Sequence, residues 1–204
     1  MHPIQRPQSW WSQYRADVER TYEAPPTLLR SIAGFLFHAG LRATLLHRIA
    51  HRFWRRRALR PLAAVLKRAG TALTGAEIHP AAQLGGGVHL PHPTGVVIGP
   101  TVVIQGPATI FQQVTLGPRG AAGAPGSGPR LGPYTSIYPG ARVLGAIQLG
   151  ARVQVGPNCV VYRSLADGTT VLPAEPTVLE GLSFTLRFET EGEKAAHDLT
   201  GAPA

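Results

Sequence analysis

The chain has 204 residues, enough for one domain and an accessory segment, and only 15% of them are charged. Its 24 glycines and 19 prolines indicate many turns, and its single cysteine excludes an intramolecular disulfide framework. The net charge of +9 at pH 7 suits an anionic partner, but no nucleic-acid-binding motif accompanies it, so we expect no nucleic-acid partner.

The first twenty residues carry charge throughout and contain no apolar core, so they do not resemble a secretory signal. A chain with one cysteine is also compatible with a reducing compartment. We therefore expect a cytoplasmic protein.

Residues 1–73 show helical periodicity and predict an N-terminal helical segment. A short polar helix should end before Pro25-Pro26. The longest apolar stretch, residues 28–46, is interrupted by Arg30, His38 and Arg42. It predicts a buried amphipathic helix rather than a membrane span.

Arginines cluster in residues 47–60, the part of the helical segment that holds much of the positive charge. The favoured interpretation is a solvated helix face and linker. The alternatives are attraction of a polyanionic substrate or cofactor, or peripheral contact with an anionic membrane surface. The arginines concerned are Arg48, Arg52, Arg55, Arg56, Arg57 and Arg60.

From about residue 75 to 165 the period changes to six, which is typical of a parallel β-helix. One aliphatic series consists of Ile78, Leu84, Leu90, Ile98, Ile104, Ile110, Leu116, Leu131, Ile137, Val143, Leu149, Val155 and Val161. A second apolar or small series, four positions later, consists of Ala82, Val88, Val102, Ala108, Val114, Thr135, Ala141, Ile147, Val153, Cys159 and Leu165. An antiparallel sheet with glycine-rich turns is the alternative, but period-two alternation would not keep a count of six. The fold class is therefore mainly β: a single-stranded parallel β-helix over residues 74–172, with Cys159 in its core.

Two breaks interrupt this count. The interval from Leu90 to Ile98 is eight residues, and the interval from Leu116 to Leu131 is fifteen. Insertions in a solenoid form loops on one face, where binding residues are often found. Beyond the repeats, residues 173–204 predict a polar C-terminal tail.

The first break presents a histidine between two prolines, Pro91-His92-Pro93. Glu77 precedes His92 by 15 residues, close to the 18 of one three-sided coil. A carboxylate that accepts a hydrogen bond from one ring nitrogen leaves the other nitrogen free as a base. The pattern predicts a dyad that activates a hydroxyl. His79 and His89 are interpreted as structural or surface residues, and we expect no metal site.

The second break extrudes a glycine-rich segment, residues 117–130. Backbone amides without side-chain bulk suit the close approach of a long cofactor, although a flexible surface loop is the simpler interpretation. No Gly-Lys-Ser/Thr follows, so the segment is not a Walker loop.

Four runs of sequence together resemble the serine acetyltransferase branch of the left-handed hexapeptide-repeat acyltransferases. This resemblance covers about residues 10–172. It implies a left-handed β-helix, acetyl-CoA as donor, and a homotrimer with active sites between subunits, whose helical segment can pair two trimers. The runs are LRATLLHRIAHRFWRRR (41–57), TGAEIHPAAQLGGGVHLPHPTGVVIG (74–99), IFQQVTLG (110–117) and YPGARVLGAIQLGARVQVGPNCVV (138–161).

The resemblance assigns roles to particular residues. His92 matches the catalytic base, and Glu77 matches its orienting carboxylate, which is usually aspartate in the family. Arg130 keeps a basic residue where the family has lysine beside the loop. We expect cofactor contacts at Gly117, Gly120, Arg130 and Pro139.

Other family positions differ. Pro91 replaces an acidic residue, Ser127 and Gly128 replace an Arg-His pair, and Pro25-Pro26 replaces Asp-Pro. These family residues bind serine's charged groups or assist the base, and losing one charge-assisted hydrogen bond costs about 1.5–3 kcal/mol. The chain ends in Ala204 rather than the isoleucine that docks into cysteine synthase, so that complex is not expected.

The sequence therefore predicts an acetyl-CoA-dependent O-acetyltransferase that acts on the hydroxyl of a small or glycosyl acceptor. The segment LPHPTGVVIG resembles a Pro-His-Pro subgroup that includes proteins associated with sugar acetylation. One alternative is serine O-acetylation in cysteine biosynthesis. The other is a non-catalytic trimeric scaffold.

Overall fold

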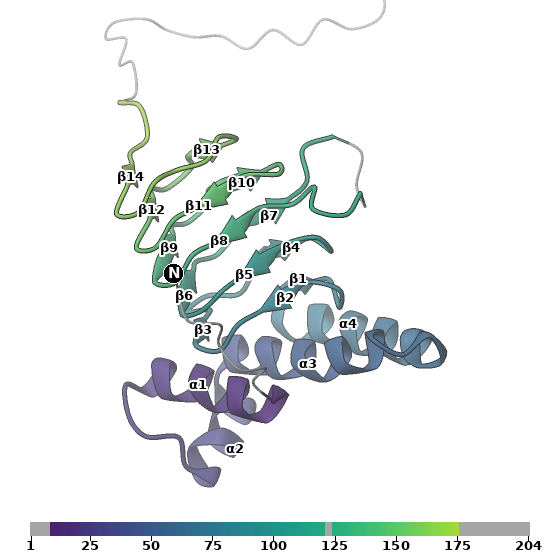
Figure 1. Ribbon diagram of the computed structural model, residues 1–204. Helices are drawn as coiled ribbons and strands as arrows, with labels where there is room; N and C mark the ends of the chain where they lie inside the picture. The colour runs from purple at the N-terminus through teal and green to yellow at the C-terminus, as the bar shows by residue number, and fades with distance from the viewer. Residues whose placement is uncertain (1–8, 121–123, 176–204) are drawn as a thin grey trace, which may run out of the picture. The chain divides into compact units, whose positions relative to one another are not determined.

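The structure, a computed structural model, describes residues 9–120 and 124–175, and helices precede strands in it (Figure 1). The predicted tail lies almost entirely outside these residues. The helices are α1 (Trp10–Tyr22), α2 (Leu28–Phe37), α3 (Ala39–Trp54), the 3₁₀ turn η1 (Arg57–Leu59) and α4 (Arg60–Thr74).

A side-chain cap marks the start of α1, and a left-handed backbone conformation marks its end. The Ser9 Oγ accepts a hydrogen bond from the Ser12 backbone amide at 3.1 Å and caps the N-terminus of α1. Glu23, with φ 49°, closes the C-terminus in the left-handed conformation. The expected end before Pro25-Pro26 is confirmed.

The apolar stretch 28–46 does not form one buried helix, so that prediction is wrong. The chain turns at His38, whose extended backbone (φ −109°, ψ 107°) separates α2 from α3. Most residues of α2 are apolar, but the side of the helix that packs inward carries Ser31 and Gly34, so the apolar side faces outward. Leu29 and Phe37 remain 76% and 81% exposed.

Among the described residues, no helix combines the length and the apolarity that crossing a bilayer requires.

Parallel strands follow the helices and form three sheets, because the chain visits each sheet in turn (Figure 1). Sheet A contains β1 (Glu77–Ile78), β4 (Val97–Ile98), β7 (Thr115–Gly117), β10 (Arg142–Leu144) and β13 (Val160–Val161). Sheet B contains β2 (Gln83–Leu84), β5 (Val103–Ile104), β8 (Arg130–Leu131) and β11 (Gln148–Leu149). Sheet C contains β3 (Val88–His89), β6 (Ala108–Ile110), β9 (Thr135–Ile137), β12 (Gln154–Val155) and β14 (Thr170–Val171).

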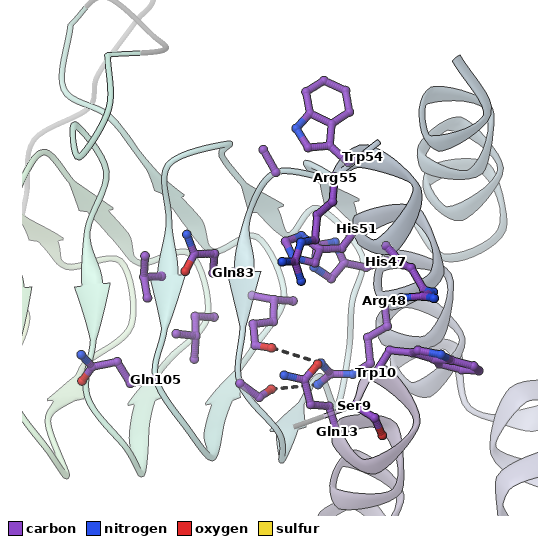
Figure 2. A pocket seen from close by; sticks show the side chains of 16 residues that line it. Ser9, Trp10, Gln13, His47, Arg48, His51, Trp54, Arg55, Gln83 and Gln105 are labelled. Atoms are coloured by element: carbon purple, nitrogen blue, oxygen red, sulfur yellow. Dashed lines mark hydrogen bonds between the residues drawn. The ribbon is translucent and has the colours of Figure 1, made fainter. Parts of the chain in front are cut away.

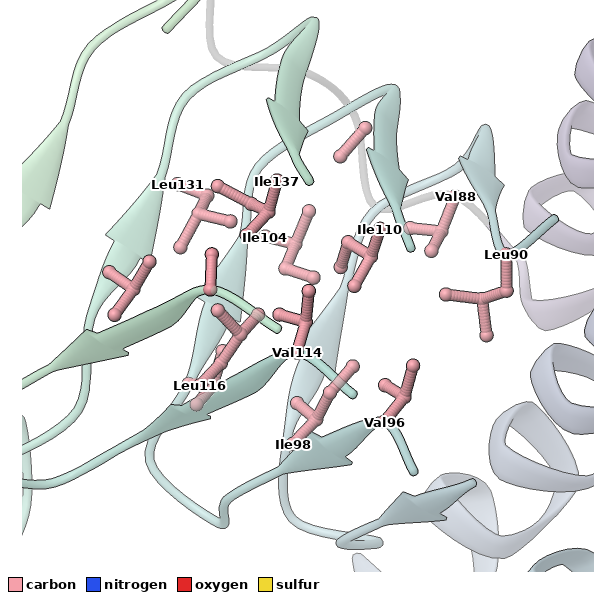
Figure 3. Packing of buried hydrophobic residues seen from close by; sticks show 14 of the residues in the cluster. Val88, Leu90, Val96, Ile98, Ile104, Ile110, Val114, Leu116, Leu131 and Ile137 are labelled. Carbon is pink, nitrogen blue, oxygen red and sulfur yellow. The ribbon is translucent and has the colours of Figure 1, made fainter. Parts of the chain in front are cut away.

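Both apolar series point into the centre of this three-sided coil and pack against one another (Figure 3). Ile98, Val114 and Leu116 are at most 1% exposed. Cys159 is 7% exposed, so its predicted burial is confirmed. A six-residue unit is too small to bury its own apolar face, so each coil depends on its neighbours for stability.

The strand register confirms both breaks in the count. Val97 pairs with Thr115, eighteen residues on, which is the regular coil. Glu77 pairs with Val97, twenty residues on, and Thr115 pairs with Arg142, twenty-seven residues on. The extra residues lie outside the pairing strands, at the corners.

One assignment at the end of the series needs correction. Leu165 bridges to Leu149, sixteen residues earlier, so this coil is two residues short. Leu165 therefore stacks on the first aliphatic series, not on the second as predicted.

The helices cover the end of the β-helix that carries its first coil (Figure 1). α1 packs on β3, and α4 packs on β1. Gly75, with φ 72°, ends α4 and turns the chain directly into β1. The helical segment is thereby fixed next to the corner that carries His92.

Candidate active site

His92 lies at the corner between β3 and β4. Pro93 is buried, whereas His92 is exposed. The Gly95 amide donates to the Gly75 carbonyl at 2.9 Å, and the Gln113 amide donates to the Thr94 carbonyl at 3.0 Å. The corner is therefore held by backbone hydrogen bonds and presents the imidazole to the outside.

Glu77 lies on β1, in the same coil as His92. Its carboxylate accepts a hydrogen bond from the Lys67 Nζ at 2.6 Å. Within residues 9–120 and 124–175 the structure contains no hydrogen bond between Glu77 and His92. The dyad therefore stays a prediction.

In the next two coils, aromatic and proline residues occupy the same corner of the prism as His92. The segments that follow β6 and β9 occupy the same corner, and there the Phe111 and Tyr138 rings stack with centroids 5.4 Å apart and planes 8° from parallel. The Gly140 amide donates to the Gln112 carbonyl at 3.0 Å. Pro139 thus shares a corner with His92, two coils away.

The glycine-rich extrusion leaves from a different corner, between β7 and β8. A Cβ added at Gly117 or Gly120 would meet nothing within 4 Å, so a ligand can approach this backbone closely. Arg130 is exposed at the start of β8. Within one chain, Gly117, Gly120 and Arg130 are therefore not brought together with His92 and Pro139.

The extrusion is anchored at two described points. The Arg119 guanidinium lies 5.0 Å from the centre of the Tyr162 ring. The hydroxyls of Ser127 and Thr101 are 3.3 Å apart.

A buried ion pair joins α1, α3 and the first coil, and the sequence interpretation missed it. The Arg48 Nε and Nη2 each donate to a different Asp17 carboxylate oxygen at 2.8 Å. The Arg48 Nη1 and Nη2 also donate to the Leu84 and Gly85 carbonyls, at 3.1 and 2.8 Å (Figure 2). The remaining acceptor capacity of Asp17 is filled by backbone amides of the coil: its Oδ1 accepts from Gly87 and Val88, both at 2.9 Å.

Arg48 is only 3% exposed, so the prediction of a solvated face is wrong for this residue. Burial raises the pKa of the Asp17 carboxyl, and the Arg48 guanidinium opposes that shift. The available signal was the helical stripe of small and apolar residues on α3 on which Arg48 falls. Arg52, Arg55, Arg56 and Arg57 are exposed, as predicted.

A hollow of about 790 Å³ lies between α3 and the outer face of sheet B (Figure 2). Arg52 and Arg55 line it together with His47 and His51. The His51 Nδ1 donates to the Pro80 carbonyl at 2.8 Å, since a carbonyl can only accept. Burial, with help from Arg48, holds the pKa of His47 well below its usual value.

A three-sided prism of parallel strands, built from six-residue units and presenting a histidine at one corner, has the architecture of a hexapeptide-repeat acyltransferase. The chain is 36% identical over 157 residues to serine acetyltransferase from Synechococcus elongatus, and the match covers 77% of this chain and 64% of that protein. It is 37% identical over 158 residues to serine acetyltransferase from Helicobacter pylori strain J99, covering 78% and 91%. The chain belongs to the serine acetyltransferase family.

Solved structures agree with this assignment. Serine acetyltransferase from Brucella abortus strain S19, in complex with coenzyme A, is 30% identical, has a TM-score of 0.72, and matches over 82% of this chain and 66% of that one. The likeness confirms a left-handed β-helix with an N-terminal helical region. The chain spans less than two thirds of the Synechococcus relative, and no protein-family model matches it.

Proposed function

We propose that the protein is an acetyl-CoA-dependent O-acetyltransferase with His92 as its general base. The observation that carries the proposal is an exposed imidazole on a rigid corner in a chain of the serine acetyltransferase family. His92 takes the proton of the acceptor hydroxyl, and the oxygen attacks the thioester carbonyl. The tetrahedral intermediate expels the coenzyme A thiolate, and His92 returns the proton to that sulfur. Backbone amides of the β-helix hold the oxyanion.

The transfer is direct, without an acyl-cysteine. Cys159 is the chain's single cysteine and is buried in the β-helix core. A thiol enclosed in the core cannot meet both the thioester and the acceptor.

Glu77 orients His92 in this proposal, although its carboxylate contacts Lys67 in the structure. The side chains of Glu77 and Lys67 are 52% and 27% exposed. An exposed ion pair contributes at most about 1 kcal/mol, so leaving Lys67 for the imidazole costs little.

The proposed cofactor residues fit acetyl-CoA. The open backbone at Gly117 and Gly120 allows close approach of a long ligand. The exposed Arg130 guanidinium suits the phosphates of coenzyme A. Pro139 lies beside the stacked Phe111 and Tyr138, on the His92 corner. Because these residues occupy two corners, we propose a homotrimer in which neighbouring subunits complete each site, with pairing of trimers as a further possibility.

The names of the relatives favour serine as the acceptor. The sequence instead favoured a different acceptor, a small or glycosyl compound that carries a hydroxyl group. That second candidate is supported by Pro91, Ser127 and Gly128, which stand where the resemblance implies charged residues. A non-catalytic scaffold is the third possibility.

Release of coenzyme A from acetyl-CoA, measured with serine, homoserine and sugar acceptors, tests the proposal. His92→Ala should lower kcat/KM about 10²- to 10⁴-fold because proton removal is lost, and Glu77→Gln should lower it less. Cys159→Ala is the control and should leave turnover unchanged. Full turnover by folded His92→Ala would refute the mechanism, and a folded oligomer inactive with every acceptor would favour the scaffold.

A further inference from the structure

The hollow of about 790 Å³ between α3 and the outer face of sheet B lies away from the His92 corner (Figure 2). His92 stands where sheets C and A meet, and sheet B is the face of the three-sided prism opposite that corner. Within one chain this hollow is therefore separate from the proposed catalytic base, and the proposed function gives it no role.

Two arginines supply positive charge to this hollow without an opposing carboxylate. Arg52 and Arg55 are exposed and lie three residues apart at the end of α3. Arg48 also lines the hollow, but its guanidinium is paired with Asp17. No acidic residue lines the hollow, and within residues 9–120 and 124–175 Arg52 and Arg55 form no ion pair. The hollow therefore attracts an anion, and two guanidinium groups match a phosphate monoester, whose charge is about −1.5 to −2 at pH 7.

His47 offers a hydrogen-bond acceptor in the same hollow. It is 5% exposed, and its Nδ1 is buried without a hydrogen-bond partner among the described residues. Burial lowers its pKa, so the ring is neutral near pH 7 and carries one proton. A hydrogen bond to the Ala82 backbone raises the pKa, as a carbonyl acceptor does, so that proton lies on Nε2. The Nδ1 lone pair is left for a donor, and a buried polar atom without a partner is uncommon.

His51 offers a second acceptor, one turn further along α3. Its Nδ1 donates to the Pro80 carbonyl at 2.8 Å, so in the neutral ring the Nε2 carries the lone pair. The centroids of the two imidazole rings are 5.9 Å apart, so one small molecule can reach both. Gln83 and Gln105 add carboxamides from sheet B (Figure 2). A carboxamide donates and accepts, so the hollow combines partners for several hydroxyl groups with partners for one anion.

We infer that this hollow is a second ligand site and binds a sugar phosphate, with the phosphate on Arg52 and Arg55 and hydroxyl groups donating to His47 and His51. The inference goes beyond the proposed function, and binding alone decides it, whether or not acetyl transfer occurs. A free sugar phosphate and the ribose phosphate of a nucleotide offer the same chemistry. A carboxylate fits less well, because its single negative charge matches only one of the two guanidinium groups.

Titration calorimetry on the full-length chain, with ribose 5-phosphate as the probe, tests the site. Inorganic phosphate offers the anion alone and ribose offers the hydroxyl groups alone, so each should bind more weakly than the probe by about tenfold or more. Adenosine 5′-monophosphate separates the two sources. Binding as tight as that of the probe supports a nucleotide, and weaker binding supports a free sugar phosphate.

Paired substitutions locate the phosphate. Arg52→Gln combined with Arg55→Gln should weaken binding of ribose 5-phosphate about ten- to hundredfold, because charge-assisted hydrogen bonds are lost. Arg56→Gln combined with Arg57→Gln is the matched control. It removes the same charge from two exposed arginines of the same cluster that do not line the hollow, and binding should match wild type.

A third variant tests the hydroxyl groups. His47→Phe keeps a ring but removes the acceptor, so it should weaken binding of ribose 5-phosphate and leave binding of inorganic phosphate unchanged. Circular dichroism checks that each variant is folded. If His47→Phe does not fold, the two arginine pairs decide the test, because their side chains are exposed.

Several outcomes overturn the inference. These are no saturable binding of ribose 5-phosphate at concentrations up to tens of millimolar, equally tight binding of inorganic phosphate, and equal losses in the two arginine pairs. Displacement of the probe by coenzyme A, together with a raised KM for acetyl-CoA in the Arg52 and Arg55 variant, would assign the hollow to the donor and also overturn a second site. Failure of the proposed function looks different, since the probe then binds while no acceptor is acetylated.

Discussion

Arg48 shows how one side chain joins the helical segment to the β-helix. It donates to the carboxylate of Asp17 on α1 and to two carbonyls of the first coil. The pair is almost fully enclosed, so each charge has left water and is compensated by the other, by backbone groups and by the Gln13 side-chain oxygen, which accepts from the Arg48 Nη1. The geometry of this ion pair therefore sets how α1 packs on β3 of sheet C.

Arg48→Met should lower the free energy of unfolding by about 3–5 kcal/mol, because Asp17 is left as a buried carboxylate without its cation. Urea denaturation followed by circular dichroism measures the change. Arg52→Met, one turn further along α3 and exposed, is the matched control and should stay within about 0.5 kcal/mol of wild type. Equal losses in the two variants would show that the buried pair has no special role.

For single residues, the sequence predicted only part of what the structure shows. The exposed corner position of His92 was predictable because two prolines and an interrupted count surround it. The burial of Asp17 was not, since an acidic residue on a short polar helix looks solvated until the surface it faces is known. Its backbone partners come from β3 and the turn after β2, about 70 residues away in the chain.

Among the elements, the strands were more predictable than the helices. A strand of the prism must place an aliphatic residue inward once per six residues, so register and breaks are visible in the sequence. The helices have no such constraint. Residues 28–46 split at His38, and α2 leaves Leu29 and Phe37 exposed, because tertiary packing rather than periodicity decides which helix faces are covered.

Gly40 shows a contact between elements that supports the His92 corner. It lies at the start of α3, where an added Cβ would overlap the carbonyl oxygen of Leu90, two residues before His92. The overlap is with backbone, which cannot rotate away. We expect α3 and the corner to separate if this position gains a side chain.

Gly40→Ala should therefore lower the free energy of unfolding by about 1–3 kcal/mol, the usual cost of overpacking, and reduce turnover by displacing His92. Gly70→Ala in α4 is the matched control, since its Cβ would lie 3.8 Å from Leu46, an ordinary contact. That change should stabilise the chain by about 0.5–1 kcal/mol, because alanine favours helix. The idea is refuted if both alanines have the same effect on unfolding in urea and on coenzyme A release.

In the whole molecule, the proposed catalytic and cofactor residues lie on two different corners of one prism. His92 and Pro139 occupy the corner between sheets C and A, whereas Gly117, Gly120 and Arg130 lie at the corner between sheets A and B. In the trimer that we propose, a ligand that contacts both sets lies between two prisms. Rotational symmetry makes this possible, because it sets one corner of each subunit against the other corner of its neighbour.

Mixed oligomers test this arrangement. His92→Ala and Arg130→Ala should each have low activity alone, the second through weaker acetyl-CoA binding. If each site takes His92 from one subunit and Arg130 from the next, random equal mixing in a trimer leaves roughly a quarter of sites with both residues. Coenzyme A release by a refolded one-to-one mixture should then recover toward roughly a quarter of wild type, with the trimer mass checked by light scattering. If both residues acted within one chain, every site would carry one of the two changes and no activity would return.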